Sequence, residues 1–151
     1  MFSKGCEYAI RAAIYIASKS EYDTKISLTE IASEIGAPIP FTAKILHKLS
    51  KGRIVESIKG PNGGFSINNQ SISKVNLTQI VEAIDGKSVF EECSLGFKMC
   101  NDVKPCPVHH KYKEIRHTFK IMMETTSLAE MSIGIKSNQT YLKQTEFLPP
   151  C

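Results

Sequence analysis

The amino-acid sequence predicts a mainly α-helical fold with one small β-hairpin. Apolar residues recur at helical spacing in several stretches, and a short segment between residues 53 and 68 combines β-branched residues with closely spaced glycines. A longer helical pattern follows in the last third of the 151 residues. A chain of this length with 42% hydrophobic residues is expected to form one compact domain with an appendage.

The first two predicted helices are short and amphipathic. Residues 3–18 form the first helix, whose apolar stripe consists of Tyr8, Ala9, Ala12, Ala13, Ile16 and Ala17. Ser27 and Glu30 have the spacing of a capping box at the start of the second helix, because each side chain can bind a free backbone N–H there. Gly36 is suited to end that helix.

The third predicted helix begins near Pro40, since a proline costs little at a first helical position, and it ends near Ser50. Its inward face is expected to comprise Phe41, Ile45, Leu46 and Leu49. Its outward face is expected to comprise Thr42, Lys44, His47 and Lys48. Two short helices joined by a tight turn, the second of them basic, form the helix-turn-helix pattern.

A predicted β-hairpin follows this helix pair directly. Residues 53–58 form its first strand, residues 60–64 a glycine-rich turn and residues 65–68 the returning strand, with Lys59 at the tip. A helix-turn-helix followed by such a hairpin is a winged helix. Between residues 39 and 61, five basic residues oppose one acidic residue, and this local charge of +4 equals the net charge of the chain. We therefore expect an anionic partner, double-stranded DNA, at this surface.

Two more helices are predicted after the hairpin, one over residues 76–85 and one from Pro107 to about Thr126. The apolar residues of the second are spaced as a heptad seam, which consists of Val108, Tyr112, Ile115, Phe119 and Met122. Such a seam needs a partner helix, in the same chain or in a second copy. We expect a homodimer, because a protein that reads two half-sites needs one.

These patterns divide the chain into four predicted regions. Residues 1–86 form a winged helix-turn-helix domain, residues 87–106 a cysteine-containing loop, residues 107–131 a dimerisation helix and residues 132–151 a flexible polar tail. Three of the five cysteines lie in the loop: Cys93, Cys100 and Cys106. Thiolates gathered on a loop suit an iron–sulfur cluster, zinc or cuprous copper. Because a cluster normally takes four ligands, His109 could complete the set, or it could have a structural role.

Other chemistries fit the same residues. A Cys₃His zinc site matches by ligand count, although the six- and five-residue spacings between the cysteines are wider than in a usual zinc knuckle. A thiol switch that uses two of the cysteines is also consistent, since Lys98 and Lys104 could favour a thiolate. Cys6 is expected to be a packed small residue, and Cys151 to be exposed and incidental.

The composition favours a cytoplasmic protein. The apolar run near the N-terminus is interrupted by Arg11 and lacks the cleavage site of a signal peptide. No stretch approaches the roughly 20 apolar residues of a membrane-spanning helix, so no membrane partner is expected. The odd cysteine count argues against a disulfide framework. Motifs of nucleotide-binding, hydrolase and zinc-protease enzymes do not occur, so we expect neither an enzyme nor a small-molecule substrate.

Four segments resemble one family when taken together. They are residues 3–12, residues 27–32, the hairpin over residues 57–65 and the three-cysteine loop. They resemble the IscR/NsrR-type winged-helix iron–sulfur transcription regulators of bacteria (the Rrf-two superfamily). This resemblance implies a homodimer that binds a pseudo-palindromic DNA operator, with an iron–sulfur cluster near the dimer helix.

The resemblance also implies the cluster ligands. Cys93, Cys100 and Cys106 correspond to the family's three cluster cysteines, and His109 to the histidine ligand of the IscR-like branch, where the cluster is 2Fe–2S. In the NsrR-like branch, a nitric-oxide sensor with a 4Fe–4S cluster, an acidic residue from the first helix of the other subunit is the fourth ligand, and Glu7 occupies that position here. Both alternatives stay open, because six rather than five residues separate the first two cysteines.

The sequence therefore predicts a transcription regulator whose operator binding is controlled by a cluster that senses redox state, iron–sulfur status or nitric oxide. The alternatives are a cluster-free, zinc-binding or thiol-switch member of the same fold, and a zinc-stabilised protein-interaction module. The candidate DNA-binding residues are Ser3, Lys4, Thr29, Pro40, Phe41, Thr42, Lys44, His47, Lys48, Lys59, Gly60, Pro61, Asn62 and Gly63. We expect lysine and hydroxyl contacts to phosphate, with one or two side chains reading bases.

Overall fold

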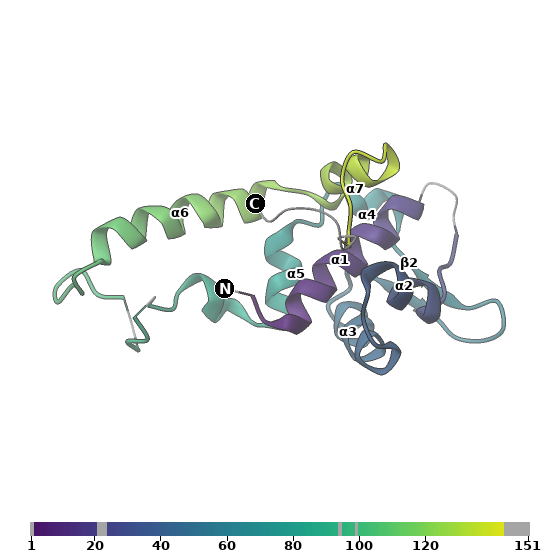
Figure 1. Cartoon of the computed structure of the whole chain (residues 1–151), viewed down its shortest axis with the longest axis horizontal. Helices are drawn as coiled ribbons and strands as arrows, with labels where there is room; N and C mark the ends of the chain where they lie inside the picture. The colour runs from purple at the N-terminus through teal and green to yellow at the C-terminus, as the bar shows by residue number, and fades with distance from the viewer. Residues whose placement is uncertain (1, 21–23, 94, 99, 144–151) are drawn as a thin grey trace.

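A computed structural model describes residues 2–20, 24–93, 95–98 and 100–143. It has a helical body at one end, from which one long helix and the cysteine-containing loop extend (Figure 1). The helices of the body are α1 (Lys4–Lys19), α2 (Leu28–Ile35), α3 (Ile39–Lys51), α4 (Asn69–Ile72), α5 (Leu77–Ile84) and α7 (Leu128–Lys136). The predicted fold class, mainly helical with a small hairpin, is confirmed.

Helix α1 lies at the centre of the body. It contacts α2, α3, α5 and α7. Its alanines Ala9, Ala12, Ala13 and Ala17 are fully buried, so the predicted stripe of small residues lets the neighbouring helices approach closely. The side chain of Ser3 caps this helix by accepting a hydrogen bond from the N–H of Cys6 at 3.1 Å.

Helix α2 is capped at both ends. Ser27 accepts a hydrogen bond from the Glu30 N–H at 3.2 Å, as predicted. The carboxylate of Glu30 instead accepts a hydrogen bond from the Tyr15 hydroxyl at 2.8 Å, so it connects α2 to α1. Gly36 ends α2 with a φ of 67°, a left-handed conformation that glycine adopts easily.

The predicted faces of α3 need two corrections. Phe41, expected inside, is 37% exposed and packs edge-on against Tyr8. Thr42, expected outside, is fully buried, and its hydroxyl donates to the Pro38 carbonyl at 3.0 Å. Because this local hydrogen bond satisfies the hydroxyl, Thr42 can occupy the core position that the sequence assigned to its neighbour Phe41.

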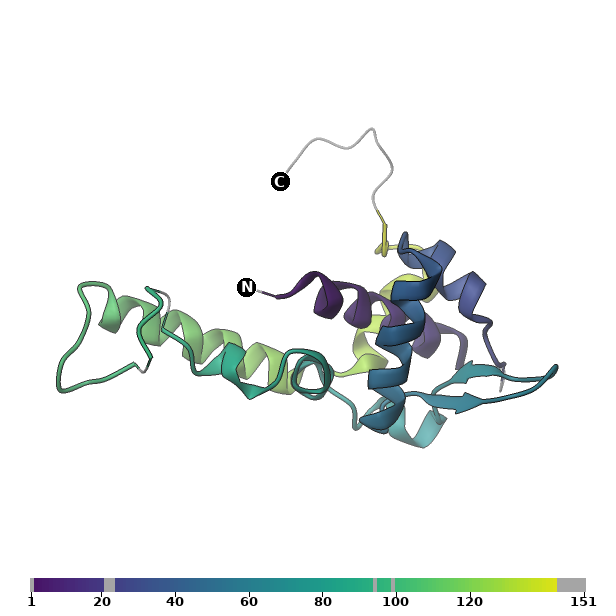
Figure 2. The same ribbon diagram turned by 90° about the horizontal axis from the view of Figure 1, so that it is seen from below.

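The wing is a two-stranded antiparallel hairpin of β1 (Glu56–Ile58) and β2 (Gly64–Ser66), and it projects from the body (Figure 2). Both strands are shorter than predicted, and Arg53 has a left-handed φ of 59°, which interrupts an extended strand there. Ile26 and Phe65 exchange two backbone hydrogen bonds of 2.9 Å, which attach the wing to the segment before α2.

The C-terminal part contains η2 (Lys87–Phe90) and α6 (His109–Thr125), with the cysteine loop running beside α6 (Figures 1 and 2). Helix α7 continues beyond the predicted boundary at residue 131, and Leu128 and Ser132 are buried in the body. Helix α7 therefore extends into the region that the sequence predicted as a tail. Residues 144–151, with Cys151, lie outside the described residues. Within the described ranges, no helix is both long and apolar enough to cross a membrane.

Candidate metal centre and DNA-binding surface

Arg116 of α6 holds the start of the cysteine loop, and a turn within the loop follows. The Arg116 guanidinium of α6 donates to the carbonyls of Glu91 and Glu92 at 3.3 and 3.2 Å. Gly96, with a φ of 76°, donates its N–H to the Cys93 carbonyl at 2.9 Å and so reverses the chain just after the first loop cysteine. Cys93 is thereby buried between the loop and α6.

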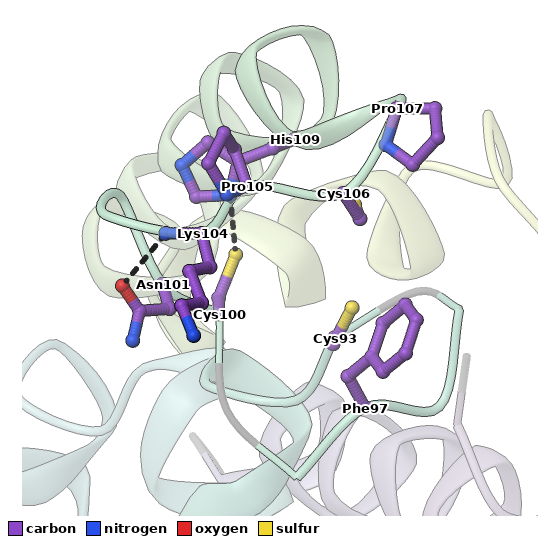
Figure 3. A pocket seen from close by; sticks show the side chains of 9 residues that line it. All are labelled: Cys93, Phe97, Cys100, Asn101, Lys104, Pro105, Cys106, Pro107 and His109. Carbon is purple, nitrogen blue, oxygen red and sulfur yellow. Dashed lines mark hydrogen bonds between the residues drawn. The ribbon is translucent and has the colours of Figure 1, made fainter.

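The three loop cysteines and His109 line one cavity of about 320 Å³ (Figure 3). His109 is the first residue of α6 and is only 3% exposed. Its backbone N–H donates to the Cys106 carbonyl at 3.0 Å, so the turn into the helix brings the backbones of these two residues together. The other lining residues are Phe97, Asn101, Lys104, Pro105 and Pro107.

Two of the donor groups around this cavity are in direct contact. The Nδ1 atom of His109 lies 3.1 Å from the Sγ atom of Cys100. Cys93 and Cys106 line the same cavity. The backbone N–H groups of Leu95 and, less strongly, Phe97 hold the pKa of the Cys93 thiol below its usual value, although burial acts in the opposite direction.

The donors do not surround a single point. Among the described residues, no three histidine, cysteine, aspartate or glutamate side chains are close enough together to hold one metal ion. The predicted convergence of three sulfurs on one position is therefore not found, although all four donors line one cavity.

An aspartate that we did not predict contacts the His109 ring on the side away from Cys100. Asp102 Oδ1 lies 2.7 Å from His109 Nε2, and both carboxylate oxygens accept from Lys113 Nζ at 2.9 Å. Lys113, and then His109, lower the pKa of Asp102 to about 2. Lys113 could have been found, since it lies four residues after His109 on one helix face. Asp102 could not, because its position depends on the folded loop.

The alternative ligand Glu7 lies in the first turn of α1 and is engaged in an ion pair. Its carboxylate is 2.7 Å from Lys4 Nζ, and this lysine holds the pKa of Glu7 below its usual value. Lys4, a candidate for phosphate contact, is exposed beside it. Glu7, the candidate cluster ligand, and Lys4, the candidate phosphate contact, are thus ion-paired with each other within one chain.

The predicted DNA-binding surface combines α3 and the wing. Lys44, His47 and Lys48 are exposed on α3, and Lys59 is exposed at the wing. A hollow of about 410 Å³ between these elements is lined by Ala43, His47, Ser50, Ser57, Lys59 and Phe65. Lys48 also donates to the Ile84 carbonyl at the end of α5, at 3.4 Å.

Two predicted DNA contacts do not suit that role. Thr42 is buried in the body and cannot reach DNA. Ser3 donates both its N–H, at 2.9 Å, and its hydroxyl to the carboxylate of Asp85, so it has no donor left for a phosphate. Thr29, Pro40, Phe41, Gly60, Pro61 and Asn62 are exposed, and Gly63 is half-buried in the wing turn.

Comparison with known proteins identifies the family. A family profile described as "Rrf2: Iron-dependent Transcriptional regulator" matches residues 2–133. The chain belongs to the Rrf2 family. This Rrf2 protein is a transcriptional regulator, and transcription regulators of this family bind DNA. The resemblance stated from the sequence is confirmed.

Its relatives and structural neighbours agree. A protein of Aquifex aeolicus, classed by name among HTH-type transcriptional regulators, is 33% identical over 87% of this chain and 90% of its own length. The HTH-type transcriptional regulator IscR of Yersinia pestis is 24% identical over 85% of this chain and 76% of its own.

The solved structures show the fold. CymR of B. subtilis, the global cysteine regulator, has a TM-score of 0.74 at 17% identity, over 88% of this chain and 96% of CymR. T. potens IscR has a TM-score of 0.70 at 18% identity, over 93% of this chain and 91% of its own. The winged-helix architecture is therefore confirmed.

Proposed function

We propose that this Rrf2 regulator is a homodimer whose binding to a DNA operator is controlled by an iron–sulfur cluster. Cys93, Cys100, Cys106 and His109 would hold the cluster. The observation that carries the proposal is that three thiols and one imidazole from a loop and a helix start line a single cavity. These are donor types found at iron–sulfur centres.

The pairing of the donors suits a two-iron cluster. Four protein ligands shared between two irons give two per iron, so the donors need to form two pairs rather than surround one ion. Cys100 and His109 form one such pair, and Cys93 and Cys106, which line the same cavity, would form the other. When bound, the cluster would supply a group whose charge and presence respond to redox state, iron supply or nitric oxide.

The contacts at the end of α5 support a route from the loop to the DNA-binding elements. The loop follows the end of α5, where Asp85 accepts hydrogen bonds from Ser3, the capping residue of α1, and Ile84 accepts one from Lys48 of α3. Ligand binding that orders the loop would therefore act on the helix end that holds both α1 and the predicted recognition helix.

The exposed seam on α6 supports the dimer. Val108, Ile115 and Met122 are 39%, 64% and 46% exposed although they lie on the predicted seam. Apolar side chains that line one side of a projecting helix need a covering surface. A second copy of α6 supplies one with two-fold symmetry, which matches a two-fold operator.

The test is to purify the protein without oxygen and to measure iron, sulfide, zinc and the visible spectrum. We expect iron and sulfide with visible absorbance, lost in Cys100→Ala and kept in Cys151→Ala. Affinity for a duplex selected from random sequence should differ between the cluster-loaded protein and Cys100→Ala by on the order of 1–3 kcal/mol.

Each contrary outcome removes a different part of the proposal. Colourless protein with stoichiometric zinc would replace the cluster by a Cys₃His zinc site. Equal DNA affinity in the loaded protein, the metal-free protein and Cys100→Ala would exclude sensing but leave DNA binding. Absence of binding to any selected duplex would favour the protein-interaction module.

A further inference from the structure

We infer that Asp102 is a positioning residue that fixes the His109 ring with Nδ1 toward the cysteines, so that Nδ1 is the nitrogen offered to a metal. The inference deepens the proposed function and rests on it for the role of His109 as a ligand. Lys113 completes the arrangement by holding Asp102 in place.

The two ring nitrogens of His109 have different partners. Nε2 lies 2.7 Å from a carboxylate oxygen of Asp102, and Nδ1 lies 3.1 Å from the sulfur of Cys100. An ionised carboxylate can only accept hydrogen bonds, so in a neutral ring Nε2 must carry the proton. The lone pair of Nδ1 then points at Cys100 and the cavity.

Burial makes this orientation specific. The His109 side chain is 2% exposed, so the ring has little water to hydrogen-bond with, and its polar atoms depend on Asp102 and Cys100. A flipped ring would place the carbon Cε1 where Nε2 now donates its hydrogen bond to Asp102. The carboxylate therefore selects one ring orientation and one tautomer.

Asp102 is itself held although it lies at the surface. Its side chain is 65% exposed, which would normally leave it free to rotate. Lys113 Nζ lies 2.9 Å from each of its oxygens, and Lys113 is one helical turn beyond His109 on α6. The loop between Cys100 and Cys106 is thus fixed to the helix that carries the histidine, which brings Cys100 next to Nδ1.

A carboxylate behind a metal-binding histidine fixes the ring and makes the ligand more basic, and its removal typically lowers metal affinity by about 10–100-fold. Asp102 and Lys113 supply that support here. By the same reasoning, an amide at position 102 should restore the orientation in part, because its oxygen still accepts from Nε2–H.

The test has one arm without metal and one with it. In the metal-free chain, ¹⁵N NMR of the His109 ring near neutral pH should show the Nε2–H tautomer, retained in Asp102→Asn and lost or averaged in Asp102→Ala. In the loaded chain, iron loss to a chelator should be about 10–100-fold faster in Asp102→Ala, intermediate in Asp102→Asn and unchanged in Glu114→Ala, an exposed carboxylate on the same helix.

The outcomes separate this inference from the proposed function. A wild-type Nδ1–H tautomer, or an Asp102→Ala variant that matches Glu114→Ala in both arms, would overturn the role of Asp102. If the wild-type chain takes up no iron, the proposed function fails, and the metal-free arm still decides whether Asp102 sets the ring. Lys113→Met should shift both readouts in the direction of Asp102→Ala, since it frees the carboxylate.

Discussion

Cys6, the described cysteine that lies outside the loop, has an unusual chemical environment. It is fully buried at the start of α1, next to the carboxylate of Asp85. Burial, and then the negative charge of Asp85, raise the pKa of its thiol from 9.0 to about 12. The thiol therefore stays protonated in the folded protein at pH values where an unfolded chain has already lost that proton.

This shift predicts a loss of stability in alkali. The stabilising contribution is complete below pH 9 and declines as the pH rises toward 12, because the unfolded chain then binds fewer protons than the folded one. For one group the slope is at most about 1.4 kcal/mol per pH unit. Urea unfolding at pH 8 and pH 10 should show a larger drop for wild type than for Cys6→Ala, and equal drops would contradict the assignment.

Single residues also show where sequence reasoning succeeds and where it stops. The sequence grouped the three loop cysteines with His109, and all four line one cavity, because they lie close together in the chain. Thr42 and Ser3 were placed on the DNA side because their hydroxyls are polar. Each hydroxyl instead binds a group inside the protein, Pro38 or Asp85, and the second contact spans 82 residues.

Among the elements, α7 contributes to the body although much of it was predicted to be tail. Leu128 at its start is fully buried and its N–H donates to the Val75 carbonyl at 2.8 Å. Leu128→Ala should lower the free energy of unfolding by about 2–5 kcal/mol, because it leaves a cavity in the core. Ile133→Ala, on the same helix but 62% exposed, should change it by less than about 1 kcal/mol. Urea unfolding at one fixed protein concentration compares them, and similar values for both would place α7 outside the core.

The wing permits a prediction about DNA. Lys59 lies between β1 and the glycine turn and is exposed. If it contacts a phosphate, Lys59→Ala should weaken binding to all sequences and reduce the slope of log affinity against log salt by about one unit. Lys120→Ala, which removes the same charge from α6, serves as the control. An unchanged slope in Lys59→Ala would mean that the wing does not touch phosphate.

The helices were more predictable than the hairpin for a physical reason. Helix ends carry local signals, such as Ser27 and Gly36, and the structure has both caps where the sequence placed them. The extent of β1 and β2 depends instead on pairing across the hairpin and on the bridge between Ile26 and Phe65, which join distant segments. The left-handed Arg53 carries no signal in the sequence.

At the scale of the whole molecule, the exposed seam of α6 predicts the assembly. Ile115→Glu should convert a dimer into monomers and weaken operator binding, because a buried, unpaired carboxylate would oppose association. Lys120→Glu, on a different face of the same helix, should leave the dimer intact. Sedimentation velocity distinguishes these states. A dimeric Ile115→Glu variant would show that the seam of α6 is not the dimer interface.

The projection of α6 from the body also has a mechanical consequence. The cysteine loop extends along this helix to the end that is far from the wing (Figures 1 and 2). A helix of 17 residues is about 25 Å long at 1.5 Å per residue. Rotating such an arm by roughly 10° about one end moves the other by about 4 Å, which exceeds the length of a hydrogen bond. A small change of tilt at the cysteine end of α6 would thus produce a larger displacement at its other end. That displacement would be enough to separate the DNA-binding lysines from the phosphates of the operator.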